Sequence, residues 1–413
     1  MLQRLAVSGL KSLAHVDVEL KPLVVLFGPN SAGKSSFVDA VHLLSNTATA
    51  RTVAEVFAWP LRGYPHEFFA LPAEGLAGLL GQESSALRLE ADLQVPGGPG
   101  AYRYAVELTL TPRTGAVRVT DELLGRLTKA GVVRGRAKIE RQDGTVSVRR
   151  TQGSGHPRSE PLGLPHTLLS DQRFSGEAYA EIETVRTEVS RWRTYYLDPF
   201  GAMRADHPPA EVDDVGEIGQ SLGAYLYRLK HDPEHGRRFD AVVRALRLAV
   251  PEVDAVLVDL DRRRGLIELS VRQAGTPFSV RVLSEGTLRV LALCAIAVNP
   301  WAGSLVALEE PENGVHPRRL DTIADLLVRA AHERQVIVTT HSPRFVARMV
   351  REQRSAPERV VVLVCRRECG ATVIAPFAGL DGLFSAGEIA EALSDSDDEQ
   401  AVAALLQRGW LDG

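Results

Sequence analysis

Residues 23–35 read LVVLFGPNSAGKS, an apolar run that passes directly into a glycine-rich loop. The first five residues are rich in β-formers and predict a short strand that is buried on both faces. The helical spacing of Phe37, Ala40, Val41 and Leu44 predicts a helix directly after the loop. Strand, loop and helix in this order are the context that a phosphate-binding G-x-x-x-x-G-K-[ST] loop requires. These flanks disfavour the alternative, a chance glycine-rich turn.

The residue types in the loop suit phosphate binding. Glycines let backbone N–H groups converge on phosphates at the positive end of the following helix. We expect Lys34 to neutralise the β- and γ-phosphate oxygens, and the Ser35 hydroxyl to hold Mg²⁺. The sequence therefore predicts a nucleotide-binding loop. Its members are Gly28, Pro29, Asn30, Ser31, Ala32, Gly33, Lys34, Ser35 and Ser36.

A second buried strand, predicted at Ser304–Leu308, ends in two adjacent acids. Glu309 is expected to hold Mg²⁺ through water, and Glu310 to align and deprotonate the attacking water. Isolated acid pairs at strand ends are more commonly solvated turn residues. Here Pro311 and Pro317 stiffen the turn that follows, which favours the catalytic interpretation.

A third strand, predicted at Gln335–Thr340, ends at His341. Doubly wound sheets bind ligands at the carboxyl ends of their strands. A lone histidine would more often be incidental, but this one follows the other phosphate-site elements in the expected order. We expect His341 to contact the γ-phosphate and to sense hydrolysis.

Residues 283–289 read LSEGTLR and precede an apolar helix. Ser284 is a good N-cap, and the simplest interpretation is that it does nothing else. The functional interpretation is that Ser284, Glu285 and Gly286 form an anion site at the helix start, with no phosphate nearby in their own subunit. The anion would then come from a second copy, which implies a head-to-tail homodimer with two nucleotides in its interface.

The segments GPNSAGKS, LSEGTLR, LVALEEPENGVHP and VIVTTHSP resemble the SMC/RecF branch of ABC-type ATPases. More narrowly, the chain resembles AAA-type ATPases akin to the ATPase half of overcoming-lysogenization-defect (OLD) nucleases. Residues 5–13 match the first strand and the F-K-S segment of this family, with Leu10 in place of the usual aromatic residue. The likeness covers residues 1–45 and 210–350 well and the middle of the chain only loosely.

The resemblance implies an α/β fold: a P-loop NTPase head of the ABC type, with a mixed central sheet, an antiparallel β-subdomain and a helical insertion. It implies an ATPase that uses ATP and Mg²⁺, with Lys34, Glu310 and His341 as catalytic residues. Ser35 and Glu309 would hold the metal. The nuclease half of OLD proteins is not expected here, because no TOPRIM-type acidic cluster follows His341, and the acids at 395–399 are typical of a solvated tail loop.

Other features depart from the family or stay open. The usual Walker B aspartate is replaced by Glu309, a common variant in this subgroup. Gln82 is either the Q-loop glutamine or a plain turn residue. One heptad-like stretch is too short for an SMC-type arm. It comprises Ala178, Ile182, Val185, Val189 and Trp192.

We expect the chain to have three parts. Residues 1–150 form an N-terminal ATPase lobe with the loop and an antiparallel subdomain, whose strands we expect at 87–95, 102–110, 116–120 and in a hairpin at 137–150. Residues 151–248 form a flexible connection and a mainly helical insertion. Residues 249–413 form a C-terminal lobe, with two strands within 253–280, a last edge strand at 360–364 and a small helical tail.

The composition sets limits on function. The net charge of −4 over 413 residues gives no global polycationic signal for nucleic-acid binding. Three cysteines without a second ligand pair indicate free thiols in a reducing cytoplasm. The longest apolar run, at 290–298, is too short for a membrane span, and no signal peptide precedes the first strand. A membrane transporter's ATPase subunit is also disfavoured, because many residues separate the glycine-rich loop from the LSEGTLR segment at 283–289, which corresponds to the signature segment of ABC-type ATPases.

A cluster of basic residues in the hairpin region raises the question of whether the protein binds DNA. It comprises Arg134, Arg136, Lys138, Arg141, Arg149 and Arg150. Such a cluster could follow a DNA backbone, although a solvated hairpin face is the more common explanation.

Two functions remain. The first is an ATPase that engages double-stranded DNA, in repair or in defence against foreign DNA, with a separately encoded nuclease or effector. The second is an ATP-gated scaffold for a partner toxin or effector, without DNA binding.

Overall fold

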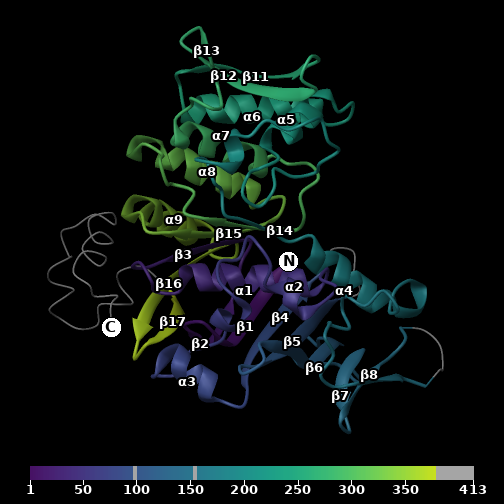
Figure 1. The fold of residues 1–413 in the computed structure, drawn as a ribbon. Coiled ribbons are helices and arrows are strands. Elements are labelled where there is room, and N and C mark those ends of the chain that lie inside the picture. Colours follow the sequence, from purple (N-terminus) through teal and green to yellow (C-terminus); the bar gives the residue numbers. More distant parts are fainter. Residues whose placement is uncertain (96–99, 152–155, 378–413) are drawn as a thin grey trace, which may run out of the picture.

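A mixed sheet lies at the centre of the computed structural model, which describes residues 1–95, 100–151 and 156–377 (Figure 1). Its strands follow the order β10 (Arg193–Tyr195), β14 (Leu305–Glu309), β15 (Gln335–Thr340), β3 (Leu23–Phe27), β16 (Val360–Glu368) and β17 (Ala371–Pro376). Neighbouring strands are parallel from β10 to β16, and β17 is antiparallel to β16. This is the α/β fold with a mixed central sheet that the sequence predicts.

The central sheet separates two hydrophobic cores in the described part of the chain. Side chains alternate across a strand, so Val24 and Leu26 of β3 enter one core while Val25 and Phe27 enter the other. Helix α1 (Lys34–Thr47) covers the first face. The second face is covered by α7 (Glu285–Ala297), α8 (Leu320–Ala330) and α9 (Pro343–Ser355). Burial on both faces explains why the strand is apolar at every position.

The expected antiparallel subdomain packs on the α1 side of the central sheet (Figure 1). Its strands follow the order β2 (Leu13–Glu19), β1 (Leu2–Leu10), β4 (Ser85–Gln94), β5 (Ala101–Thr111), β6 (Ala116–Arg126), β7 (Ile139–Gln142), β8 (Thr145–Val148) and β9 (Arg158–Pro161). The predicted hairpin turn forms at Asp143 and Gly144, whose φ angles of 49° and 79° suit a two-residue hairpin loop. Helices α2 (Val53–Val56) and α3 (Gly75–Gly81) precede β4.

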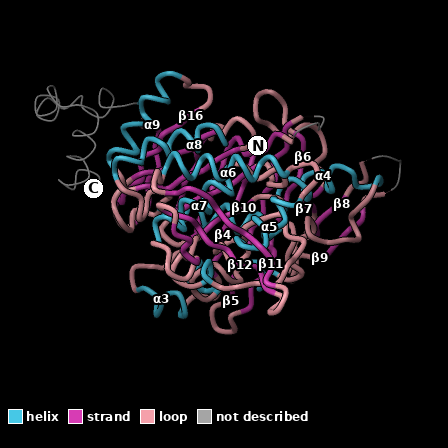
Figure 2. The backbone as a smooth tube through the Cα atoms, turned by 90° about the horizontal axis from the view of Figure 1, so that it is seen from above, coloured by secondary structure: helices cyan, strands magenta, loops and turns pink. Residues whose placement is uncertain are grey.

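The opposite side of the molecule is mainly helical. It contains α5 (Leu222–His231) and α6 (Gly236–Ala249), with the sheet of β11 (Val253–Asp261), β12 (Leu266–Gln273) and β13 (Thr276–Ser279) at the top of Figure 1. Seen from above, α6 and α8 lie side by side (Figure 2). None of the helices in the described ranges is long and apolar enough to span a bilayer.

Several predictions for segments 151–248 and 253–280 need correction. The segment expected to be a connection and a mainly helical insertion also supplies β9 and β10, and between β10 and α5 it is mostly irregular. Strands of three or four residues are too short to show a hydrophobic period, so the sequence did not reveal them. The heptad-like stretch lies largely in α4 (Ala180–Ser190), where Ile182, Val185 and Val189 are buried in the core. The region 253–280 contains the additional strand β13.

The strand predicted at 360–364 is wrong as an edge strand. It continues to Glu368 as β16, and β17 pairs with its outer side. Cys369 and Gly370, with φ angles of 49° and 83°, form the two-residue turn that returns the chain. The expected tail helix and the tail acids lie largely or wholly outside the described residues.

A buried carboxyl group fastens the antiparallel sheet to the segment beyond it. Glu122 of β6 is fully buried and accepts hydrogen bonds from the backbone N–H groups of Leu168 (2.6 Å) and Leu169 (2.8 Å). Burial raises the pKa of Glu122 from 4.5 to about 7, although these N–H donors act in the opposite direction. A raised folded-state pKa means that this group stabilises the protein below the unfolded pKa and loses that contribution as the pH rises through 7.

We therefore predict that the stability of the protein relative to its Glu122→Gln variant falls by roughly 3 kcal/mol between about pH 4.5 and about pH 7, since each pKa unit corresponds to 1.36 kcal/mol. Urea unfolding over this range measures the difference. Glu19→Gln, which changes an exposed carboxylate on β2, is the control and should leave the pH profile unchanged. Parallel profiles for the protein and Glu122→Gln would contradict the prediction.

Candidate functional site

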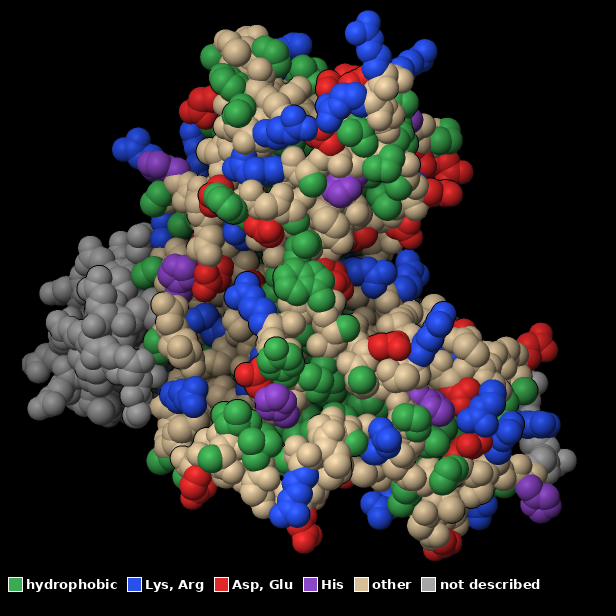
Figure 3. Space-filling view, viewed as in Figure 1, with side chains coloured by type: hydrophobic (Ala, Val, Ile, Leu, Met, Phe, Trp, Pro, Cys, Tyr) green, Lys and Arg blue, Asp and Glu red, His purple; other side chains and the backbone are tan. Residues whose placement is uncertain are grey.

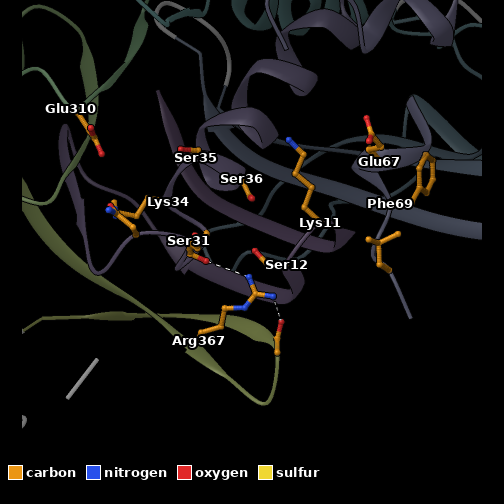
Figure 4. Close-up of a pocket in the computed structure, with 14 residues that line it drawn as sticks. Lys11, Ser12, Ser31, Lys34, Ser35, Ser36, Glu67, Phe69, Glu310 and Arg367 are labelled. Atoms are coloured by element: carbon orange, nitrogen blue, oxygen red, sulfur yellow. Dashed lines mark hydrogen bonds between the residues drawn. The ribbon is translucent and has the colours of Figure 1, made fainter. Parts of the chain in front are cut away.

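The predicted site elements meet at the carboxyl edge of the central sheet. Strands β14, β15 and β3 are neighbours, and their parallel register sets Glu309 opposite Thr339, and Thr340 opposite Phe27. A cavity of about 450 Å³ opens beside the loop that follows β3 (Figure 4). Its lining comprises Lys11, Ser12, Asn30, Ser31, Gly33, Lys34, Ser35, Ser36, Glu67, Phe69, Leu71, Glu310, Arg367 and Gly370.

Lys34 begins α1 and is 6% exposed. Its Nζ donates hydrogen bonds to the carbonyl oxygens of Gly28 and Pro29, both at 2.8 Å. Burial lowers the pKa of Lys34, while Cys365 and the nearby carboxylates, led by Glu310, act to raise it. The ammonium group is thus held inside the loop, where phosphate oxygens could replace the two carbonyl groups.

The β16–β17 hairpin packs against the loop of residues 28–35. A Cβ atom on Gly28 would lie 2.1 Å from the carbonyl oxygen of Cys365, and one on Gly33 would lie 2.2 Å from Oγ1 of Thr372. Thr372 also donates to the carbonyl oxygen of Ala32 (2.9 Å). These two glycines are therefore required by close packing as well as by their positive φ angles of 155° and 102°.

Ser35 and Glu309 are brought together, as the metal prediction requires. Burial raises the pKa of Glu309, and the neighbouring Ser35 side chain acts to lower it. Oε1 of Glu309 is buried and has no hydrogen-bond partner among the described residues. A carboxylate oxygen without a partner beside a serine hydroxyl fits Mg²⁺, which prefers oxygen ligands and keeps several waters.

Glu310 lies at the cavity wall, close to Lys34 and Ser35 (Figure 4). Its backbone has φ 43°, a conformation that costs energy for a residue with a side chain. Asn313 Nδ2 donates to Oε2 of Glu310 (2.7 Å), and Nδ1 of His341 lies 3.3 Å from Oε1. Glu310 and His341 are therefore in contact, and both carboxylate oxygens have a positioning neighbour.

Glu312 is a site residue that the sequence interpretation missed. It is 7% exposed, and its Oε1 accepts hydrogen bonds from the Thr340 hydroxyl and from the His341 N–H (3.1 Å). Burial raises the pKa of Glu312. One carboxylate thus fixes the end of β15 to the turn after β14. The buried position could not be inferred from the E-E-P-E spacing alone, because all three acids look alike in sequence.

The signature segment lies at a different surface from the cavity of its own chain. Ser284 caps α7 by accepting from the Thr287 N–H (3.2 Å), and both Ser284 and Glu285 are exposed. Gly286 packs directly on the turn after β14, since a Cβ there would lie 1.9 Å from the Gly314 carbonyl oxygen. Its own fold thus requires this glycine, which is a structural reason that the sequence interpretation did not consider.

Two further cations of the cavity had no predicted role. Lys11, at φ 49° in the β1–β2 turn, binds Oδ2 of Asp39 (2.7 Å), and Tyr196 donates to the other oxygen of Asp39 (2.9 Å). Arg367 of β16 donates to the carbonyl oxygen of Ser31 (3.3 Å) from the hairpin side (Figure 4). Lys11 stands in the quoted F-K-S segment, but Arg367 carries no motif and only the fold reveals it.

Gln82 and part of the basic cluster lie elsewhere. Gln82 is an exposed C-cap of α3 and does not line the cavity. In the hairpin region, Arg149 forms an ion pair with Glu140 (2.8 Å) and Lys138 forms one with Glu181 (3.1 Å). The cluster is therefore not a continuous row of free cations.

Comparison with known families identifies the type of domain. Residues 23–347 match the model of a family described as "AAA domain, putative AbiEii toxin, Type IV TA system". This match covers most of the chain and includes the loop, the signature segment, both acids and His341. The chain belongs to this AAA domain family. Among curated proteins, none matches the sequence significantly.

One solved structure, with a TM-score above 0.5, shows that this AAA domain has the fold of an SMC head. An SMC head bound to the C-terminal winged-helix domain of ScpA matches with a TM-score of 0.54 at 12% identity, over 92% of this chain and 99% of that one. The SMC head of Thermotoga maritima matches at 14% identity over 91% and 98%, with a TM-score of 0.42. The Pyrococcus furiosus SMC head bound to the C-terminal domain of ScpA matches at 11% identity over 95% and 99%, with a TM-score of 0.49. The fold is that of an SMC-type ABC ATPase head, whereas the narrower likeness to OLD proteins stays a prediction.

Removal of the Lys34 ammonium tests the cavity as a nucleotide site. We predict that Lys34→Ala weakens ATP binding about 100-fold or more, since charge-assisted hydrogen bonds contribute about 1.5–3 kcal/mol each. Isothermal titration calorimetry with ATP and Mg²⁺ measures the change. Lys129→Ala, which removes an exposed lysine away from the cavity, is the control and should bind like the unchanged protein. Equal affinity of Lys34→Ala and the control would exclude this loop as the site.

Proposed function

We propose that this AAA domain hydrolyses ATP as a head-to-tail homodimer. The loop of one copy holds the nucleotide, and Ser284, Glu285 and Gly286 of the other copy cover the γ-phosphate. The observation that carries the proposal is the position of the signature helix start: it is capped and exposed, but it does not line the cavity of its own chain. An anion at this helix start would therefore come from outside the chain.

Exposed hydrophobic side chains support burial of this face by a second copy. Trp59 and Tyr64 are 74% and 71% exposed in the segment before Glu67 and Phe69 of the cavity. Val282, at 69%, directly precedes the signature segment. Figure 3 shows hydrophobic side chains at the waist between the upper and lower parts of the molecule. Exposed apolar groups that flank both halves of a divided site are typical of an interaction surface.

The side chains assign the chemical roles. Lys34 neutralises phosphate oxygens, and Glu310 accepts the proton of the attacking water while Asn313 holds one of its carboxylate oxygens. His341 contacts Glu310 and is placed to sense loss of the γ-phosphate. Ser35 and Glu309 would hold Mg²⁺, which neutralises charge on the β- and γ-phosphates when bound. The Glu312 carboxylate positions His341 by accepting a hydrogen bond from the backbone N–H of His341.

A double-stranded DNA ligand is the second part of the proposal, with a separately encoded nuclease or effector in the cytoplasm. Arg134 and Arg136 line a cleft of about 620 Å³ together with Arg126 and Lys138. Both are exposed, and no ion pair joins them to an acid in the described residues. These two arginines are therefore the free cations that a phosphate backbone could contact. An ATP-gated scaffold that binds an effector without DNA is the alternative.

The dimer is tested with Glu310→Gln, which keeps the shape of the side chain but cannot accept the proton. We predict that ATP hydrolysis falls about 10²- to 10⁴-fold, the usual contribution of a general base. With ATP and Mg²⁺ the variant should accumulate at twice the monomer mass in light scattering. Addition of Ser284→Arg to this variant should return it to the mass seen without ATP. A Glu310→Gln protein whose mass does not respond to ATP would exclude the dimer.

The DNA contact is tested by reversal of the two free arginines. We predict that Arg134→Glu with Arg136→Glu lowers ATP-dependent duplex affinity and reduces the salt slope by about two, because each phosphate contact contributes about 0.9. Fluorescence anisotropy at several salt concentrations measures both quantities. Arg141→Glu, an exposed hairpin position outside the cleft, is the control. An unchanged salt slope would exclude this cleft as the DNA contact. ATP hydrolysis that is stimulated by a partner protein and not by DNA would favour the scaffold.

A further inference from the structure

A groove of about 640 Å³ is lined by residues of α6 and α8. These two helices lie on the helical side of the molecule (Figures 1 and 2). Ala297, the last residue of α7, and Val298, which follows it, form the floor of the groove. The groove is larger than the nucleotide cavity of about 450 Å³, and it shares no residue with that cavity. It is therefore a separate site that the proposed chemistry does not use.

Helix α6 carries two apolar stripes, and its own fold covers one of them. Phe239, Val242 and Leu246 are buried in the core. Ala241, Ala245 and Leu248 form the other stripe at helical spacing along the groove wall, and Leu248 is 61% exposed. Small side chains at two of these positions let another backbone approach closely. This stripe has the spacing with which one helix receives the side chains of another.

The rims of the groove carry positive charge that the fold does not neutralise. The two acids that line the groove are already engaged, because Glu333 pairs with Arg238 (3.3 Å) and Asp325 pairs with Arg348 (2.8 Å). Arg244 on the α6 rim and Arg329 on the α8 rim both line the groove, and no acidic group within the described ranges forms an ion pair with either. An apolar floor between two unpaired cations matches an occupant with an apolar stripe flanked by carboxylates.

We propose that this groove binds an acidic amphipathic helix of a partner protein. Apolar side chains at helical spacing would pack against Ala245, Leu248 and Leu326, and glutamate or aspartate side chains on either flank would pair with Arg244 and Arg329. A nucleic acid would make no use of the apolar floor, which argues for a protein segment. Rim charges of this kind select the partner and speed association.

The groove is connected to the nucleotide site through α7, and this part of the proposal rests on the proposed function. Helix α7 begins at the signature segment and ends at the groove floor. Its Gly286 packs on Gly314, in the turn that connects Glu310 to α8. A second copy that engages Ser284 would therefore act on a helix that contacts the partner at its other end. Binding of ATP and binding of the helix are then reciprocally coupled.

The experiment is selection of a displayed random-peptide library on the full-length protein, followed by anisotropy measurements with a fluorescent copy of the strongest binder. We expect enrichment of peptides with apolar residues at helical spacing and acidic flanks. Ala245→Arg, which fills the groove, should abolish binding, and Arg244→Glu with Arg329→Glu should weaken it about tenfold or more. Arg237→Glu, an exposed α6 position outside the groove, is the matched control.

Each other outcome overturns a defined part of the proposal. The acidic partner helix would be excluded by absence of enrichment, by enrichment of basic peptides, or by peptides that also bind Ala245→Arg. Peptides whose sequences correspond to segments of this chain would exclude it as well. Circular dichroism of Ala245→Arg separates loss of the groove from loss of the fold. Equal peptide affinity with and without ATP in Glu310→Gln excludes the coupling alone, and the mass measurement on that variant reports separately on the dimer.

Discussion

The parallel pairing of β14 with β15, and of β15 with β3, is the constraint on which the site depends. These strands come from opposite ends of the chain, and their register brings the phosphate-binding loop, the acid pair and His341 to one edge of the sheet. A one-residue shift would turn each side chain to the opposite face. The buried alternation on both faces of β3 fixes this register, because Val24 and Leu26 belong to one core and Val25 and Phe27 to the other.

Two short-range contacts transmit this arrangement to neighbouring elements. Glu312 fixes the end of β15 with one carboxylate oxygen, and Gly286 touches Gly314 backbone to backbone. The turn after β14 is therefore in contact with both His341 and the start of α7. Packed interfaces of this kind move as discrete bodies and do not deform continuously. This explains how a change at the nucleotide can become a displacement of α7.

Sequence reasoning was most reliable where one motif implied a whole structural context. The residues 23–35 predicted strand, loop and helix together, and the buried strands before Glu309 and His341 were equally clear. The fold class followed from the family resemblance that these motifs carry in this order. Sequence reasoning failed for β9, β10 and β13, which are too short to show a period, and for β16, which was expected to be a shorter edge strand.

Sequence reasoning could not identify the candidate site residues that no motif marks. Arg367 reaches the loop only because β16 pairs with β3, and Glu312 differs from Glu310 only by its burial. The basic hairpin was also ambiguous in sequence, because its partners Glu140 and Glu181 become visible only in three dimensions. Such roles follow from contacts between distant segments, which local spacing does not encode.

The support of the loop by Thr372 and Cys365 has a consequence for biosynthesis. Gly28 and Gly33 are translated before the hairpin that packs against them, since 340 residues separate Ala32 from Thr372. While these residues are synthesised, a nascent chain carries the loop of residues 28–35 without the strands that pack against it. The proposed nucleotide site is therefore complete only after the β16–β17 hairpin has been translated.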